Sequence, residues 1–126
     1  MTKQGIFSDK LAKAVGPFSP GVRSDGFIYV SGHVGQDPST GKVVAGGVEQ
    51  QTQQVFANLR AVLDAAGKSF DDVIRAGVYL TDMGNFASMN TIFARHFTEP
   101  YPARTTIAVA ALPLGAAVEI DLVVRG

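Results

Sequence analysis

The spacing of apolar residues along the chain predicts two amphipathic helices. Between Val48 and Ala66, apolar side chains recur at three- and four-residue steps, the period of one helix face, and Gly67 follows as a natural stop. A second apolar stripe predicts another helix that ends before Pro100, because proline cannot continue a helix. The members of this second stripe are Phe86, Met89, Phe93 and Phe97.

Further segments have the composition or the alternation of β-strands. Residues 27–31 are rich in β-branched and aromatic side chains and follow the turn-forming pair Asp25-Gly26. Three other runs alternate with a period of two, at residues 74–80, 104–111 and 118–124. The last two runs are joined by a short segment at 112–117, which predicts a hairpin.

A sheet built from these strands has one apolar face and one mixed face. The apolar positions can pack beneath the two helices; they are Ile28, Val30, Ala76, Val78, Leu80, Ile107, Val109, Val118, Ile120 and Leu122. The opposite positions are Tyr29, Ser31, Arg75, Gly77, Tyr79, Arg104, Thr106, Ala108, Ala110, Glu119 and Asp121. Two helices on one side of a sheet leave the mixed face to water or to a partner. Small residues beside tyrosines and a few charges favour a subunit interface with functional pockets.

The composition supports this interpretation. The 126 residues fit one domain, spanning positions 1–126, and 46% of them are hydrophobic, which is ordinary for a globular protein. Charged residues make up only 17%, against about 25% in an average protein. A chain this small therefore has too few charges to cover its surface in the usual way, and we expect another chain to cover part of it.

Charge and cysteine content argue against several classes of function. Eleven basic and eleven acidic side chains cancel, which argues against a nucleic-acid or membrane-surface binder. The chain has no cysteine, and His33 and His96 are its only histidines, so we expect no metal site. No signal-peptide pattern is present near the N-terminus, and the longest apolar run, 107–112, is far below the ~20 residues that span a membrane. We expect a cytoplasmic protein.

Arg104 and Glu119 are the candidate chemical groups. An arginine fork can bind a carboxylate in one orientation, and a nearby carboxylate can position or deprotonate water, so the pair could hydrolyse a small imino acid. A structural salt bridge uses the same two residue types, and spacing alone favours that alternative. In the predicted hairpin the two residues lie on the order of 20 Å apart, so a shared site needs two subunits. Ser31 and His33 offer a weaker alternative, because strand neighbours about 7 Å apart seldom form a nucleophile–base pair.

Several short motifs, in order along almost the whole chain, are similar to those of one known family. They are Ala14-Val15-Gly16-Pro17-Phe18-Ser19, Tyr29-Val30-Ser31-Gly32, Gln54 to Asn58, Leu63-Asp64-Ala65-Ala66-Gly67, Val78-Tyr79-Leu80-Thr81-Asp82-Met83, Met89-Asn90, Tyr101-Pro102-Ala103-Arg104-Thr105-Thr106, Leu112-Pro113 and Val118-Glu119-Ile120. On these motifs the chain resembles the Rid family, also called the YjgF-like family, of enamine/imine deaminases.

The resemblance implies an α+β, chorismate-mutase-like domain, with a mixed sheet and two helices on one face, assembled as a homotrimer with sites between subunits. It also implies a hydrolase that needs no cofactor and converts 2-imino or 2-enamino acids, such as 2-aminoacrylate and 2-iminopropanoate, to 2-oxo acids and ammonia. Arg104 would bind the substrate carboxylate and Glu119 would position the attacking water. The rest of the cleft would be lined by Phe18, Ser31, Gly32, Asn90 and Thr106.

Two positions depart from the best-known members of that family. Phe18 stands where tyrosine is common and Thr106 where cysteine is common, which affects substrate preference more than reaction type. Two other functions stay open. One is a regulatory module that binds a small carboxylate without turnover. The other is a ribonuclease, an older description within the family, against which the balanced charge argues.

Overall fold

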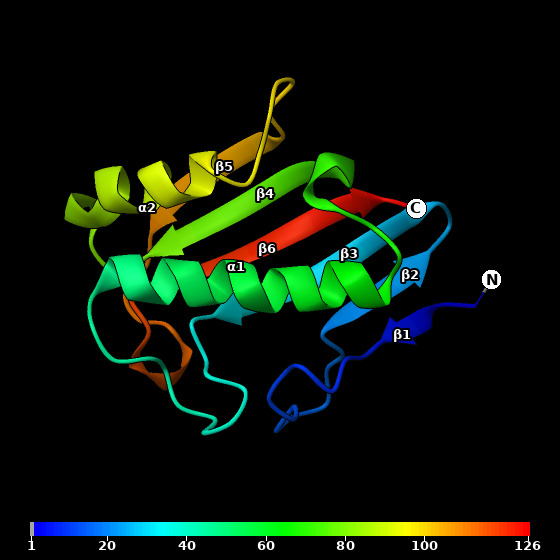
Figure 1. Ribbon diagram of the computed structural model, residues 1–126, viewed down its shortest axis with the longest axis horizontal. Helices are drawn as coiled ribbons and strands as arrows, with labels where there is room; N and C mark the ends of the chain where they lie inside the picture. The colour runs from blue at the N-terminus through cyan, green and yellow to red at the C-terminus, as the bar shows by residue number, and fades with distance from the viewer. Residues whose placement is uncertain (1) are drawn as a thin grey trace.

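Two helices cover one face of a six-stranded sheet in the computed structural model, which describes residues 2–126 (Figure 1). The strands are β1 (Gln4–Ile6), β2 (Gly21–Ser24), β3 (Phe27–Val34), β4 (Val73–Leu80), β5 (Ala103–Ala108) and β6 (Val118–Arg125), and the helices are α1 (Val48–Ala65) and α2 (Phe86–Ala94). The order across the sheet is β1-β2-β3-β6-β4-β5, and every neighbouring pair is antiparallel except the parallel pair β4 and β5. The predicted α+β domain with a mixed sheet and helices on one face is confirmed.

Helix α1 forms as its apolar spacing predicts. Val55, Leu59 and Val62 are almost completely buried and face the sheet. Gly67 ends the helix with a φ of +72°, a conformation that glycine adopts without steric cost, and the next N–H, of Lys68, donates to the Leu63 carbonyl over 2.8 Å. The stop predicted from the sequence is therefore the observed one.

An aromatic cluster joins the two helices over the sheet. Phe56 of α1 is 1% exposed, and its ring lies 5.7 Å from that of Phe93 in α2, edge to face. Phe70 and Phe97 complete the cluster at 5.6 and 6.1 Å from Phe56. Aromatic pairs at these separations add to the stabilisation that burial of their area gives.

Two short strands near the N-terminus were not predicted from the sequence. Strand β2 pairs with β3 through a two-residue turn, Asp25-Gly26, in which both residues have positive φ, +51° and +79°. An Asp-Gly pair is the preferred sequence for this hairpin turn, so the turn itself was the signal that β2 should precede β3. Strand β1 then extends the sheet by pairing with β2.

The predicted hairpin between the last two strands is wrong. Strand β6 lies between β3 and β4, whereas β5 forms the sheet edge and pairs only with β4, in parallel. The connecting segment contains a single helical turn at Pro113–Gly115, not a tight reversal. Alternation identified both strands correctly, but it carries no information about which strand is the partner of which.

The side chains of β5 also face the opposite way from the prediction. In the parallel pair, Arg104 is level with Ala76 and Thr106 with Val78, and both β4 residues are fully buried beneath the helices. Arg104 and Thr106 therefore lie on the helix side of the sheet. Ile107, which was expected in the core, is 45% exposed on the open face. For the other strands, the predicted division into a buried face and an open face is confirmed.

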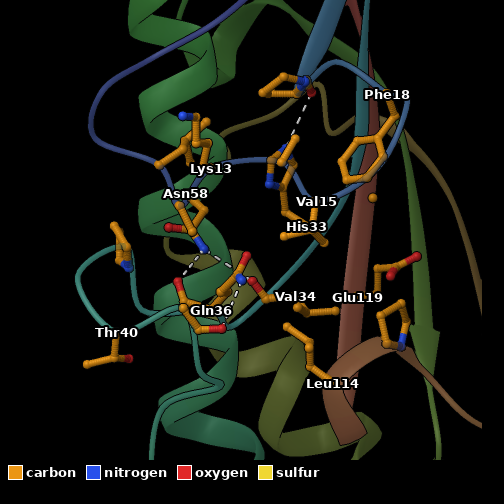
Figure 2. A pocket seen from close by; sticks show the side chains of 18 of the residues that line it. Lys13, Val15, Phe18, His33, Val34, Gln36, Thr40, Asn58, Leu114 and Glu119 are labelled. Atoms are coloured by element: carbon orange, nitrogen blue, oxygen red, sulfur yellow. Dashed lines mark hydrogen bonds between the residues drawn. The ribbon is translucent and has the colours of Figure 1, made fainter.

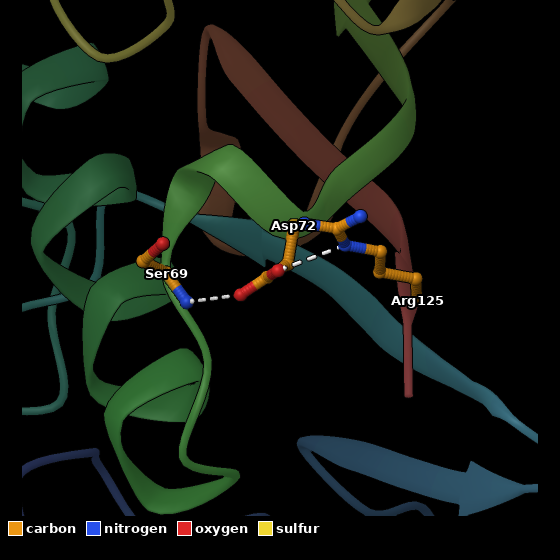
Figure 3. A network of polar contacts seen from close by, with 3 residues as sticks. All are labelled: Ser69, Asp72 and Arg125. Atoms are coloured by element: carbon orange, nitrogen blue, oxygen red, sulfur yellow. Dashed lines mark hydrogen bonds and ion pairs between the residues drawn. The ribbon is translucent and has the colours of Figure 1, made fainter.

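One exposed ion pair fastens the end of the sheet farthest from the cavity described below. Arg125 Nε lies 3.0 Å from Asp72 Oδ1, and the Ser69 N–H donates to the other oxygen of Asp72, also over 3.0 Å (Figure 3). These bonds hold the pKa of Asp72 below its usual range, with the Ser69 N–H as the larger cause. Within residues 2–126, no helix has the length and apolar character needed to cross a membrane.

Candidate active site

A cavity of about 600 Å³ opens where β3 ends and β6 begins (Figure 2). Its walls come from the segment 11–18, the loop 36–41 and the turn at Pro113 and Leu114. Three of the predicted site residues, Phe18, Gly32 and Glu119, line this cavity together. The cavity thus brings together residues from the two ends of the chain.

Glu119 lies half-buried on the open face of β6, level with Tyr79 of β4. A Cβ atom at Gly32 would come within 2.5 Å of Glu119 Oε2, so only glycine lets the carboxylate lie this close to β3. Burial raises the pKa of Glu119, and the negative charge of Asp121 raises it further. The carboxylate, once ionised, is therefore a stronger base than an exposed glutamate.

Asp121 is held firmly beside Glu119, and its role was not foreseen from the sequence. The N–H of Gly77 donates to one carboxylate oxygen over 3.0 Å, and the Tyr79 hydroxyl donates to the other over 2.9 Å. That hydrogen bond is the main reason why the pKa of Tyr79 is raised. The signal lay in the alternation of β6, because residues two apart on a strand share a face and place Asp121 next to Glu119.

Ser31 and His33 do not form a nucleophile–base pair. The Ser31 hydroxyl donates to the Ser19 carbonyl over 2.6 Å, and His33 Nε2 lies 3.3 Å from the Pro20 carbonyl. Burial lowers the pKa of His33, and the contact with Pro20 only partly opposes this. Both side chains instead fasten the segment before β2 against β3, close to Gly32.

Arg104 lies on the far side of the sheet, against helix α2. Its guanidinium carbon is 4.6 Å from the centre of the Phe93 ring and 5.6 Å from that of Phe86, within the range of cation–π contact. Partial burial lowers its pKa. Within residues 2–126 the only ion pair is that of Arg125 with Asp72, so the structural salt bridge between Arg104 and Glu119 does not form in this chain.

Two further predicted residues accompany Arg104. Asn90 lies four positions after Phe86 and three before Phe93, so it shares their face of α2. Thr106 follows Arg104 on the same side of β5, and its buried hydroxyl oxygen has no hydrogen-bond partner among residues 2–126. A buried hydroxyl without a partner costs stability.

The predicted site residues therefore form two separate groups in one chain. Arg104 is level with Ala76 of β4, and Glu119 with Tyr79, three residues further along. With ~3.3 Å per residue and ~4.8 Å between strands, the two Cα atoms are on the order of 14 Å apart, and their side chains leave opposite faces of the sheet. They cannot meet within one chain, although the hairpin used to predict this separation was wrong.

Comparison with known proteins identifies the family. Residues 8–125 match the family described as Endoribonuclease L-PSP. The chain belongs to this family, which is the Rid or YjgF-like family that its motifs predicted. The match covers the whole sheet from β2 onward, both helices and both groups of site residues.

Members of the Rid family resemble this chain over nearly its full length. A 2-iminobutanoate/2-iminopropanoate deaminase of Mus musculus is 43% identical over 94% of this chain and 87% of that protein. The RutC family protein PH0854 of Pyrococcus horikoshii is 40% identical over 96% of both chains. The crystal structure of RidA from Psychrobacter sp. PAMC 21119 is 42% identical, with a TM-score of 0.92 over 98% of this chain and 99% of that one. Fold and family are thus shown, and the family includes imine deaminases.

Proposed function

We propose that this Rid family protein hydrolyses 2-imino acids to 2-oxo acids and ammonia. Water adds its oxygen to the imine carbon, the C=N electron pair moves to nitrogen with a proton, and the resulting carbinolamine loses ammonia to leave the ketone. The half-buried Glu119 carboxylate at the edge of the cavity is the observation that carries the proposal. Its raised pKa makes the ionised carboxylate a better acceptor of a proton from water than an exposed glutamate is.

Arg104 would bind the substrate carboxylate. The guanidinium stacks on Phe93 and has no acidic partner within residues 2–126, so its fork is available for a planar carboxylate. Glu119 would position water over the imine carbon, next to the main chain of Gly32. Phe18, Ser31, Asn90 and the main chain at Thr106 would complete the walls of the site.

This arrangement requires two chains, and we propose a homotrimer with one site at each interface. The group around Glu119 would come from one subunit and the group around Arg104 from its neighbour. The open face of the sheet supports such an assembly, because Phe27, Tyr29 and Ile107 leave 41%, 50% and 45% of their surfaces exposed there. Light scattering should give about three times the 13.2 kDa chain mass.

The decisive experiment couples the protein to a dehydratase that releases 2-aminoacrylate and follows the formation of pyruvate. We expect Arg104→Ala to lower kcat/KM by about 100-fold or more, because carboxylate orientation and charge neutralisation are lost together. Arg104→Lys should restore little, since an ammonium cannot reproduce the fork. Arg125→Ala, which removes an exposed arginine at the far end of the sheet, is the matched control and should leave the rate unchanged. Pyruvate formation at the same rate with and without the protein would disprove the proposal.

A second candidate is a module that binds a small carboxylate without turnover. The unpaired Arg104 favours it as much as it favours the enzyme. Glu119→Gln separates the two functions: an enzyme loses its rate and keeps its affinity for a 2-oxo acid, whereas a binding module has no rate to lose. RNA binding is tested by its salt dependence, because phosphate contacts would make affinity fall steeply with added salt.

A further inference from the structure

The cavity beside Glu119 is larger than a three-carbon imino acid needs. Its volume of about 600 Å³ lies in the range of pockets that hold drug-sized ligands. Large apolar side chains stand next to Glu119 on its walls, and Phe18 and Leu114 remain 57% and 59% exposed. Figure 2 shows Glu119 between Phe18 above and Leu114 below.

Leu114 occupies this wall at a cost in backbone energy. Its φ of +60° and ψ of +19° lie in the left-handed region, which is unfavourable for a residue with a Cβ atom. Glycine would adopt this conformation freely, and the fold recovers little by burial because the side chain is mostly exposed. A strained, exposed leucine at the edge of a candidate active site points to a contact made with a ligand.

The polar groups in the cavity are mostly engaged by the protein itself. The Asn58 amide donates to the carbonyls of Val34 and Gln36 over 3.1 and 3.0 Å, and one ring nitrogen of His33 contacts Pro20. Among the described residues that line the cavity, Lys13 is the one lysine or arginine, and it is exposed to solvent. The remaining surface suits an apolar ligand group.

We propose that Leu114 and Phe18 form a subsite for the side chain of a 2-imino acid with a long or branched aliphatic chain. The inference rests on the proposed function, which places the imine carbon near Glu119; from there, a substrate side chain that enters the cavity would meet Leu114 and Phe18. The protein then prefers imino acids of the size derived from leucine or methionine over the one derived from alanine.

The test compares imino acids made by one amino-acid oxidase, in excess, from leucine and from alanine. We expect kcat/KM for the leucine-derived 2-imino-4-methylpentanoate to be about tenfold or more above that for 2-iminopropanoate. A single methylene group bound in an apolar pocket changes kcat/KM by about tenfold at least. Leu114→Gly should lower this ratio by about fivefold or more without loss of stability, because glycine suits the observed backbone. Met83→Ala, which truncates a 44% exposed side chain outside the cavity, should leave the ratio unchanged.

The possible outcomes test the proposed subsite and the proposed deaminase reaction separately. Equal or faster hydrolysis of the alanine-derived substrate, or preference for the glutamate-derived one through Lys13, overturns the inference while the deaminase function stands. Binding of 4-methyl-2-oxopentanoate and pyruvate, measured by calorimetry, gives a readout without turnover. Tighter binding of the larger acid, lost in Leu114→Gly, supports the subsite even if hydrolysis fails. Equal binding and no turnover disprove both proposals.

Discussion

Replacing Gly32 with alanine tests how finely Glu119 must be placed. An added Cβ would lie 2.5 Å from Glu119 Oε2 and 2.8 Å from Cδ, whereas ordinary contact begins at 3.4 Å. The difference between 3.4 and 2.5 Å means that the carboxylate must retreat by about 0.9 Å. Misplacing a catalytic group by about 1 Å can cost about 100-fold in rate. We therefore expect kcat for imine hydrolysis to fall by about two orders of magnitude.

The same substitution should leave the fold intact. The atoms in the way belong to the end of a flexible side chain, and alanine is favoured over glycine within a strand by roughly 0.5–1 kcal/mol. KM should change little, because Arg104, which would bind the carboxylate, is not disturbed. The assay is therefore a kcat and KM measurement together with thermal unfolding.

A second glycine provides the control. Gly47 has open space around it and a φ of −103°, so Gly47→Ala adds a methyl group without displacing any side chain. Its catalytic rate should equal that of the wild type. If Gly32→Ala keeps the wild-type kcat while remaining folded, Glu119 does not act from the position seen here, and its role as the water-positioning base would have to be abandoned.

Three other outcomes follow from the structure. Since a base must be ionised, activity should rise as the pH increases through the raised pKa of Glu119. Asp121→Asn removes one cause of that raised pKa, so it should move the acidic limb of the pH–rate profile to lower pH, and an unchanged profile would contradict this. Thr106→Val removes a buried hydroxyl without a partner, so it should increase the free energy of unfolding, measured by urea denaturation, by about 1 kcal/mol. A decrease would show that the hydroxyl makes a stabilising hydrogen bond. Phe56→Ala should destabilise the fold by about 3–5 kcal/mol, measured in the same way, and a loss below about 1 kcal/mol would mean that the aromatic cluster can collapse around the cavity.

Local sequence patterns were sufficient to predict the helices and strands that bury a continuous row of apolar side chains. Helix α1 and strands β4 and β6 each have a buried face whose period is visible in the sequence, so both element and face could be predicted. Strand β5 has no fully buried residue, and its alternation therefore says nothing about which side faces the helices. That is why Arg104 and Ile107 were assigned to the wrong faces.

The arrangement of the site could not be predicted from local patterns either, because it depends on which strands pair. The group of Phe18, Gly32 and Glu119 depends on the pairing of β6 with β3, which no local pattern specifies. The hydrogen bonds by which Gly77 and Tyr79 of β4 hold Asp121 in place depend in the same way on the pairing of β6 with β4. The resemblance to a known family predicted these residues as one site, because motifs shared along the whole chain carry long-range information that periodicity lacks.

The low charge content and the divided site both favour assembly with another chain. Of the 126 residues only 17% are charged, and the open face presents Phe27, Tyr29 and Ile107 to the exterior. A face of this kind is stabilised by meeting another chain. Arg104, at the sheet edge, cannot reach the Glu119 of its own chain, and in the trimer that we propose it would meet the Glu119 of a neighbour. In the proposed trimer, assembly would therefore both bury the apolar face and complete the catalytic pair, so that a dissociated subunit would keep its fold and lack the activity.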